Sequence, residues 1–250
     1  MSIKMRVLNH SPWIGTFPLN PFHEKIYEKK SPEKEQNLPI TPFLRIAFST
    51  VLLSYTLTTR IIERIDNDMA NFIEFRKIFQ LVRSGVSVSY NEMPLDSAHL
   101  MNLDIHSLII FLDILLDDTS RFLEYLFIES HFLNFGSFLQ LKNSLKSYGG
   151  ERVEELSEIF KRTDWYEELN KLRNKPVVHT GVKGGGVGTE GDQVGIYLRT
   201  RTKKNKISEA KFMSNVEIDR VCDNVHSFLN ELNSFLCQNF ESLPLKVRKK

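Results

Sequence analysis

The stretch that decides the fold is residues 103–126, which read LDIHSLIIFLDILLDDTSRFLEYL. Apolar residues recur in it at steps of three and four, the spacing of one face of an α-helix. They are Leu108, Ile109, Leu112, Leu115, Leu116, Phe122, Leu123 and Leu126. A face this wide cannot remain in water, so the helix must lie inside the protein. We predict a central helix from about Asp96 or Asp104 to Ser130.

Similar periodicity on both sides of this stretch predicts further helices. Residues 41–85 carry apolar side chains at helical steps, which indicates one long helix or two with a break near Thr58 and Thr59. Ser214 followed by Glu217 forms the capping-box pattern that begins a helix. Asp164 followed by Glu167 has the same pattern. The remaining helices are predicted at 137–147, 151–162, 165–175 and 215–238.

One segment has the period of a β-strand instead. In GIYLRTRTKKNKIS, residues 195–208, apolar and polar side chains alternate, and a second strand through 207–213 would complete a hairpin at 194–213. A lone hairpin is marginally stable, so it must pack on the helices. Seven of the twelve glycines lie between 181 and 195, which predicts a mobile loop before the hairpin.

Composition is that of an ordinary globular protein of 250 residues, 41% hydrophobic and 26% charged. With 33 basic and 31 acidic residues, any contact with nucleic acid must come from a local basic patch. Six of the nine prolines lie in 1–42, which predicts an extended arm at 1–40. A single helical domain then covers 41–240, and 241–250 is a basic tail. The predicted fold class is mainly all-α, an up-and-down bundle with a small β-hairpin before the last helix.

Three features predict a cytoplasmic protein without a membrane anchor. Cys222 and Cys237 lie on one predicted helix and are typical of reduced intracellular thiols. The N-terminal residues lack the apolar core of a secretory signal. The longest apolar windows, 42–57 and 103–116, are shorter than the ~20 residues that span a bilayer.

The residues with the clearest chemical potential lie in LNKLRNKPVVHTG, residues 169–181. Arg173, Asn174 and His179 follow an amphipathic helical pattern. On a straight helix, six residues would leave Arg173 and His179 roughly 120° apart. Pro176 must kink or end the helix near Lys175, which allows the two side chains to come together.

The sequence RNKPVVH resembles the signature of the HEPN superfamily, an Arg, usually a polar residue next, and a His after four to six intervening positions. Here five residues intervene. The resemblance covers about residues 100 to 240. It implies an all-α up-and-down bundle, commonly a homodimer, and in many members a metal-independent endoribonuclease of toxin, defence or RNA-processing systems. RNA and an antitoxin or other protein are the partners that it implies, with no cofactor.

The chemistry of these residues fits RNA cleavage. His179 suits proton transfer because its reference pKa of roughly 6.5 lies near neutral pH. Arg173 suits a phosphate because its planar guanidinium donates two parallel hydrogen bonds, and Asn174 could orient either group. A structural role explains the same residues: Arg173 would bind an acidic residue or a carbonyl, and His179 would cap the helix end.

Two further groups are candidates for the site. Asp117 and Arg121, four residues apart, resemble an acidic and basic pair that some HEPN families carry on a preceding helix; an ordinary ion pair within the helix explains the spacing equally well. The polar side of the hairpin is typical of an RNA-binding surface and equally of a solvated strand. Its members are Tyr197, Arg199, Arg201 and Lys203.

The predicted function is a metal-independent endoribonuclease that cleaves through the ribose 2′-OH. The alternative is a non-catalytic HEPN-like helical module that binds a partner protein, a nucleotide or RNA.

Overall fold

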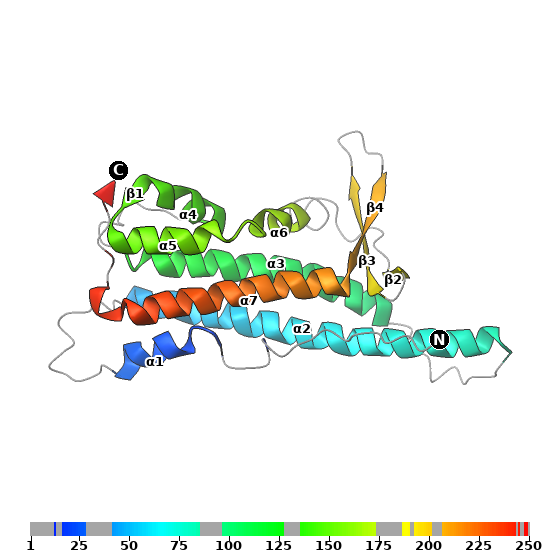
Figure 1. The fold of residues 1–250 in the computed structure, drawn as a ribbon. Coiled ribbons are helices and arrows are strands. Elements are labelled where there is room, and N and C mark those ends of the chain that lie inside the picture. Colours follow the sequence, from blue (N-terminus) through cyan, green and yellow to red (C-terminus); the bar gives the residue numbers. More distant parts are fainter. Residues whose placement is uncertain are drawn as a thin grey trace. The chain divides into compact units, whose positions relative to one another are not determined.

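The computed structural model describes residues 13, 17–28, 42–85, 97–127, 136–173, 187–190, 193–201, 207–243, 245 and 248–249. In these ranges the chain is mainly helical, with a small three-stranded sheet late in the chain (Figure 1). The predicted fold class, mainly all-α with a small hairpin before the last helix, is confirmed. None of the described helices is long and apolar enough to cross a membrane.

The chain forms two compact units, and several helices contribute residues to both. We call Met1–His10, Thr58–Ile110 and Leu169–Val221 the sheet unit, because it contains the three-stranded sheet. The helical unit comprises Ser11–Leu57, Phe111–Glu168 and Cys222–Lys250. The helices are α1 Asn20–Glu28, α2 Pro42–Arg83, α3 Ser97–Glu124, α4 Phe138–Ser144, α5 Glu151–Lys161, α6 Tyr166–Leu172 and α7 Asn215–Gln238.

The apolar stretch that predicted a central helix is α3. All eight of its predicted core residues are at most 3% exposed. The helix begins at Ser97, close to the earlier of the two predicted starts, and ends at Glu124 rather than at Ser130. Leu126 still packs in the core, because the chain continues into turns closed by a hydrogen bond from its N–H to the carbonyl of Leu123.

Helix α2 is one continuous helix of 42 residues, so the predicted alternative with a break near Thr58 and Thr59 is wrong. Thr58 is fully buried within it. The helix ends at Arg83, and Gly85 follows with φ 87°, in the left-handed region that favours glycine.

Two predicted helix starts are confirmed by their capping hydrogen bonds. Ser137 accepts the N–H of Gln140 at 3.3 Å and begins α4. Ser214 accepts the N–H of Glu217 at 3.2 Å, and the Glu217 carboxylate accepts the N–H of Ser214 at 2.9 Å, which is the reciprocal capping box.

Part of the predicted extended arm at 1–40 is helical, because α1 occupies Asn20–Glu28. Residues 1–12, 14–16 and 29–40 of the predicted arm lie outside the described residues. Pro21 lies in its first turn, where a missing N–H leaves no intrahelical bond unmade. Trp13, Phe17 and Phe22 are buried, and Trp13 stacks on Tyr55 of α2 with ring centroids 5.0 Å apart. The aromatic residues therefore hold the described part of this segment within the helical unit, and the extended conformation predicted from the prolines is wrong for residues 20–28.

The sheet has the order β2-β3-β4 and is antiparallel, with β2 at Val187–Glu190, β3 at Gln193–Arg201 and β4 at Ile207–Ser214. β3 and β4 are the predicted hairpin. β2 was not predicted, because it lies in the glycine-rich segment that was expected to be a loop. Its glycine, Gly188, lies against the aromatic ring of Tyr197. In the basic tail, β5 at Arg248–Lys249 pairs with β1 at Tyr148–Gly149.

Candidate functional site

The predicted catalytic residues lie at and beyond the end of α6. Arg173 directly follows this helix and is half-buried. Leu169 and Leu172 of α6 are buried in the core, which fixes the backbone that leads into Arg173. Asn174 and His179 lie outside the residues that the structure describes. The approach of Arg173 to His179 therefore stays a prediction.

The start of α6 differs from the predicted capping box. The helix begins at Tyr166, and the carboxylate of Asp164 binds the ammonium group of Lys142 at 3.2 Å. Lys142 also donates a hydrogen bond to the carbonyl of Thr163 at 3.1 Å. The lysine on α4 draws the carboxylate toward itself, and the N–H of Glu167 bonds to the backbone carbonyl of Asp164 instead.

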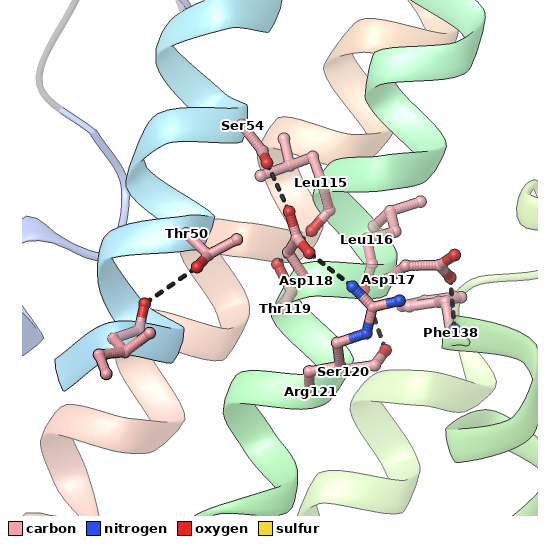
Figure 2. A network of polar contacts seen from close by, with 11 residues as sticks. Thr50, Ser54, Leu115, Leu116, Asp117, Asp118, Thr119, Ser120, Arg121 and Phe138 are labelled. Carbon is pink, nitrogen blue, oxygen red and sulfur yellow. Dashed lines mark hydrogen bonds and ion pairs between the residues drawn. The ribbon is translucent and has the colours of Figure 1, made fainter. Parts of the chain in front are cut away.

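Asp117 and Arg121 lie on α3 in the helical unit, whereas Arg173 belongs to the sheet unit. Asp117 accepts a hydrogen bond of 2.8 Å from the backbone N–H of Phe138, the first residue of α4 (Figure 2). Arg121 forms an ion pair with Asp118, Nη1 to Oδ1 3.1 Å. The ion pair that the structure shows for Arg121 is therefore with Asp118, whereas the pair predicted from the spacing was with Asp117.

Sequence reasoning missed Asp118, which is 4% exposed. Its Oδ2 accepts a 2.5 Å hydrogen bond from the hydroxyl of Ser54 on α2, as Figure 2 shows. Asp113, equally buried, accepts a hydrogen bond of 3.0 Å from the hydroxyl of Tyr166. Three aspartates of one apolar helix thus bind three different elements. Buried carboxylates are found only where they are hydrogen-bonded or paired. The acidic residues within the apolar pattern of α3 were therefore the sequence signal for these contacts between helices.

The predicted RNA-binding residues lie on and after β3. Tyr197 is half-buried and directly opposite Phe212 of β4, with ring centroids 5.1 Å apart. Partial burial, and then the negative charge of the nearby Glu190 carboxylate, raise the pKa of Tyr197. Arg199 pairs with Ala210 and Arg201 with Ile207 along the ladder. Lys203 lies outside the described residues. Phe212 was not predicted from the sequence as part of this surface; its position opposite Tyr197 in the β3-β4 ladder identifies it.

Comparison with protein-family models, with curated proteins and with solved structures finds no match to this chain. Function is therefore inferred from the residues and their chemistry.

One titratable residue of the sheet unit was not expected from sequence. Burial, and then the like charges of Asp219 and Glu63, raise the pKa of Asp66 to about 7. A carboxyl group of this kind exchanges protons near neutral pH, which is the property of a general acid or base. Asp66 lies on α2 within the compact unit that contains Arg173.

Among the described residues, no three His, Cys, Asp or Glu side chains lie together in a way that could hold a metal ion. The described groups on which a function can be built are the guanidinium of Arg173, the carboxyl group of Asp66 and the aromatic pair Tyr197 and Phe212.

Proposed function

We propose that this protein is a metal-independent endoribonuclease of the HEPN type. The observation that carries the proposal is the sequence RNKPVVH directly after α6, with Arg173 half-buried at the end of a helix anchored in the core. The same compact unit contains the hairpin with Tyr197 and the basic positions Arg199 and Arg201. A cytoplasmic location is part of the proposal, and Cys222 and Cys237 are free thiols, as such a location favours.

The proposed reaction needs two proton transfers and one stabilised phosphorane. A base removes the proton of the ribose 2′-OH, and the 2′ oxygen attacks the adjacent phosphorus. The bond from phosphorus to the 5′ oxygen breaks, and an acid gives that oxygen a proton. The products are a 2′,3′-cyclic phosphate and a free 5′-OH. His179 serves proton transfer, Arg173 binds the phosphorane oxygens through its planar fork, and Asn174 orients either group.

One Arg and one His supply too few groups for both proton transfers. A two-fold axis through the motif region would bring a second copy of each, so that one His acts as base while the other acts as acid. We therefore include a homodimer with isologous contacts in the proposal. If the protein belongs to a toxin system, an antitoxin would be a further partner.

The direct test is incubation of the purified protein with a diverse pool of single-stranded and structured RNA, with and without EDTA. Cleavage that survives EDTA and leaves 2′,3′-cyclic phosphate ends supports the proposal. If no RNA is cut, the alternative of a non-catalytic helical binding module stands. Ends that carry a 3′-OH would exclude cleavage through the ribose 2′-OH and with it the HEPN type of reaction.

A further inference from the structure

The three-stranded sheet has one face in the core and one outer face. Val194 and Ile196 on β3 and Met213 on β4 are at most 3% exposed, so the face that they share packs inward. Side chains alternate along a strand, so Gly195 and Tyr197 lie on the other face, with Phe212 opposite Tyr197. Both aromatic side chains are half-buried, so each retains accessible surface.

Two glycines form the bed on which these rings lie. A Cβ atom at Gly188 would lie 2.5 Å from Cε2 of Tyr197, and one at Gly195 would lie 2.8 Å from the tip of the Phe212 ring. Gly188 and Gly195 are direct partners in the β2-β3 ladder. Because both positions are glycine, no side chain there lifts the two rings from the sheet.

The two rings are also fixed laterally. Their centroids are 5.1 Å apart with an angle of 51° between the planes, and burial and the nearby Glu190 carboxylate of β2 raise the pKa of the Tyr197 hydroxyl. Aromatic groups held in advance lose little conformational freedom when a ligand stacks on them. We call Tyr197, Phe212, Gly188 and Gly195 the aromatic platform.

Charge at the platform selects the class of ligand. Residues 187–214, from β2 to the end of β4, contain six basic and three acidic residues, in a chain whose total net charge is +2. Glu190, which acts on the Tyr197 hydroxyl, is one of the acidic residues. Arg199 lies two residues beyond Tyr197 on the same strand. Basic residues on the same strands as the aromatic pair favour a ligand with a repeating negative charge and flat, unpaired rings. Duplex bases are stacked on one another and offer no such face.

We propose that the aromatic platform binds single-stranded nucleic acid, with bases stacked on Tyr197 and Phe212 and phosphates near Arg199. This deepens the proposed function and rests on it for the choice of RNA, since it makes unpaired RNA the substrate class. Stacking on aromatic side chains recognises unpaired RNA in other sheet-based binding sites.

The test measures binding apart from cleavage. A fluorescein-labelled 12-nucleotide 2′-O-methyl RNA lacks the attacking hydroxyl, and anisotropy reports its affinity for the full-length protein. We expect weaker binding to a 12-base-pair duplex of the same sequence. Tyr197→Leu and Phe212→Leu keep an apolar cover over the glycines but remove the π faces. Each should weaken single-strand binding roughly 5-fold or more, the range for one stacked base.

Tyr125→Leu is the matched control, because Tyr125 is an exposed tyrosine of the helical unit, and its affinity should equal that of the wild type. Should the leucine variants unfold, wild-type protein with a 2-aminopurine-labelled strand decides, since stacking changes the fluorescence of that base.

Equal affinity for the duplex, for poly-glutamate or for anionic lipid vesicles would overturn the proposal that the platform binds single-stranded nucleic acid. Unchanged binding of the single strand by both folded leucine variants would overturn it too. If the 2′-O-methyl strand binds as expected but natural RNA is not cut, the endoribonuclease proposal fails and the platform stands. If natural RNA is cut while the leucine variants bind normally, the platform alone fails.

Discussion

The hydroxyl of Ser54 on α2 donates a 2.5 Å hydrogen bond to the carboxylate of Asp118 on α3, and both side chains are buried. The other oxygen of Asp118 binds Arg121. This bond links α2 to α3 through two residues that are 64 positions apart in the sequence. A buried carboxylate that loses a donor keeps its desolvation cost, so the pair is sensitive to removal of either partner.

Ser54→Ala should therefore lower the free energy of unfolding by about 1 to 3 kcal/mol. Urea denaturation followed by circular dichroism measures the change. Ser49→Ala is the matched control on the same helix, because Ser49 is exposed and, among the described residues, its hydroxyl bonds to the carbonyl of Arg45 alone. It should shift stability by less than about 0.5 kcal/mol. Equal effects of the two substitutions would remove any special role of Ser54.

Gly195→Ala should destabilise the sheet, because the added Cβ would lie 2.1 Å from the carbonyl oxygen of Met213. That oxygen belongs to the backbone of the paired strand and cannot move without breaking the ladder. We expect a loss above about 2 kcal/mol, measured by thermal unfolding. Gly136→Ala is the control, since its Cβ would meet only the flexible end of Gln140 at 3.1 Å. A wild-type melting curve for Gly195→Ala would contradict this packing.

Asp66 should make stability depend on pH. The pKa of Asp66 is about 7 in the folded protein and near 3.8 in the unfolded chain, so the folded state binds more protons between these values. The contribution of Asp66 to stability is therefore fully present below about pH 4 and is lost as pH rises toward 7. Asp66→Asn should flatten this part of the stability profile and raise the melting temperature at pH 8. An unchanged slope in Asp66→Asn would show that the raised pKa belongs to another group.

His179→Ala should separate catalysis from folding. If His179 transfers protons, RNA cleavage should fall roughly 10²- to 10⁴-fold while the melting temperature stays near that of the wild type. If it only caps a helix, stability should fall by about 0.5 to 2 kcal/mol and cleavage per folded molecule should persist. Gel-resolved cleavage and calorimetry on the same preparation distinguish the two.

Arg173→Lys should also reduce cleavage, because lysine keeps the charge but loses the bidentate geometry. Arg152→Lys is its control: Arg152 forms a surface ion pair with Glu155 on α5, and such pairs contribute little. Cleavage by Arg173→Lys at the wild-type rate would argue that only charge is needed at this position.

A homodimer should have twice the mass of the 29.1 kDa chain by light scattering at micromolar concentration. Mixing the wild-type protein with an excess of the His179→Ala variant should lower cleavage by more than dilution of the wild-type chains explains, because a mixed dimer keeps only one of the two His side chains that the proposed reaction needs. A monomer that cleaves RNA would show that the motif of one chain is sufficient.

Local patterns determined much of this fold. The apolar period of α3 and the capping pair of Ser214 and Glu217 could be predicted because both depend on contacts within a few residues of the chain. The alternation around Ile196 predicted a strand for the same reason. The motif around Arg173 was also found by sequence alone, because its spacing is local.

Contacts between distant segments decided the rest. Thr58 and Thr59 have weak helix propensity, yet α2 continues through them, with Thr58 buried. Asp117 and Asp118 are adjacent in sequence, but one binds the start of α4 and the other binds Ser54, since a helix directs neighbouring side chains about 100° apart. Gly188 lies in strand β2, paired with Gly195 and so close to the Tyr197 ring that a Cβ atom would not fit. Such partners depend on the packing of whole elements, which no single stretch of sequence specifies.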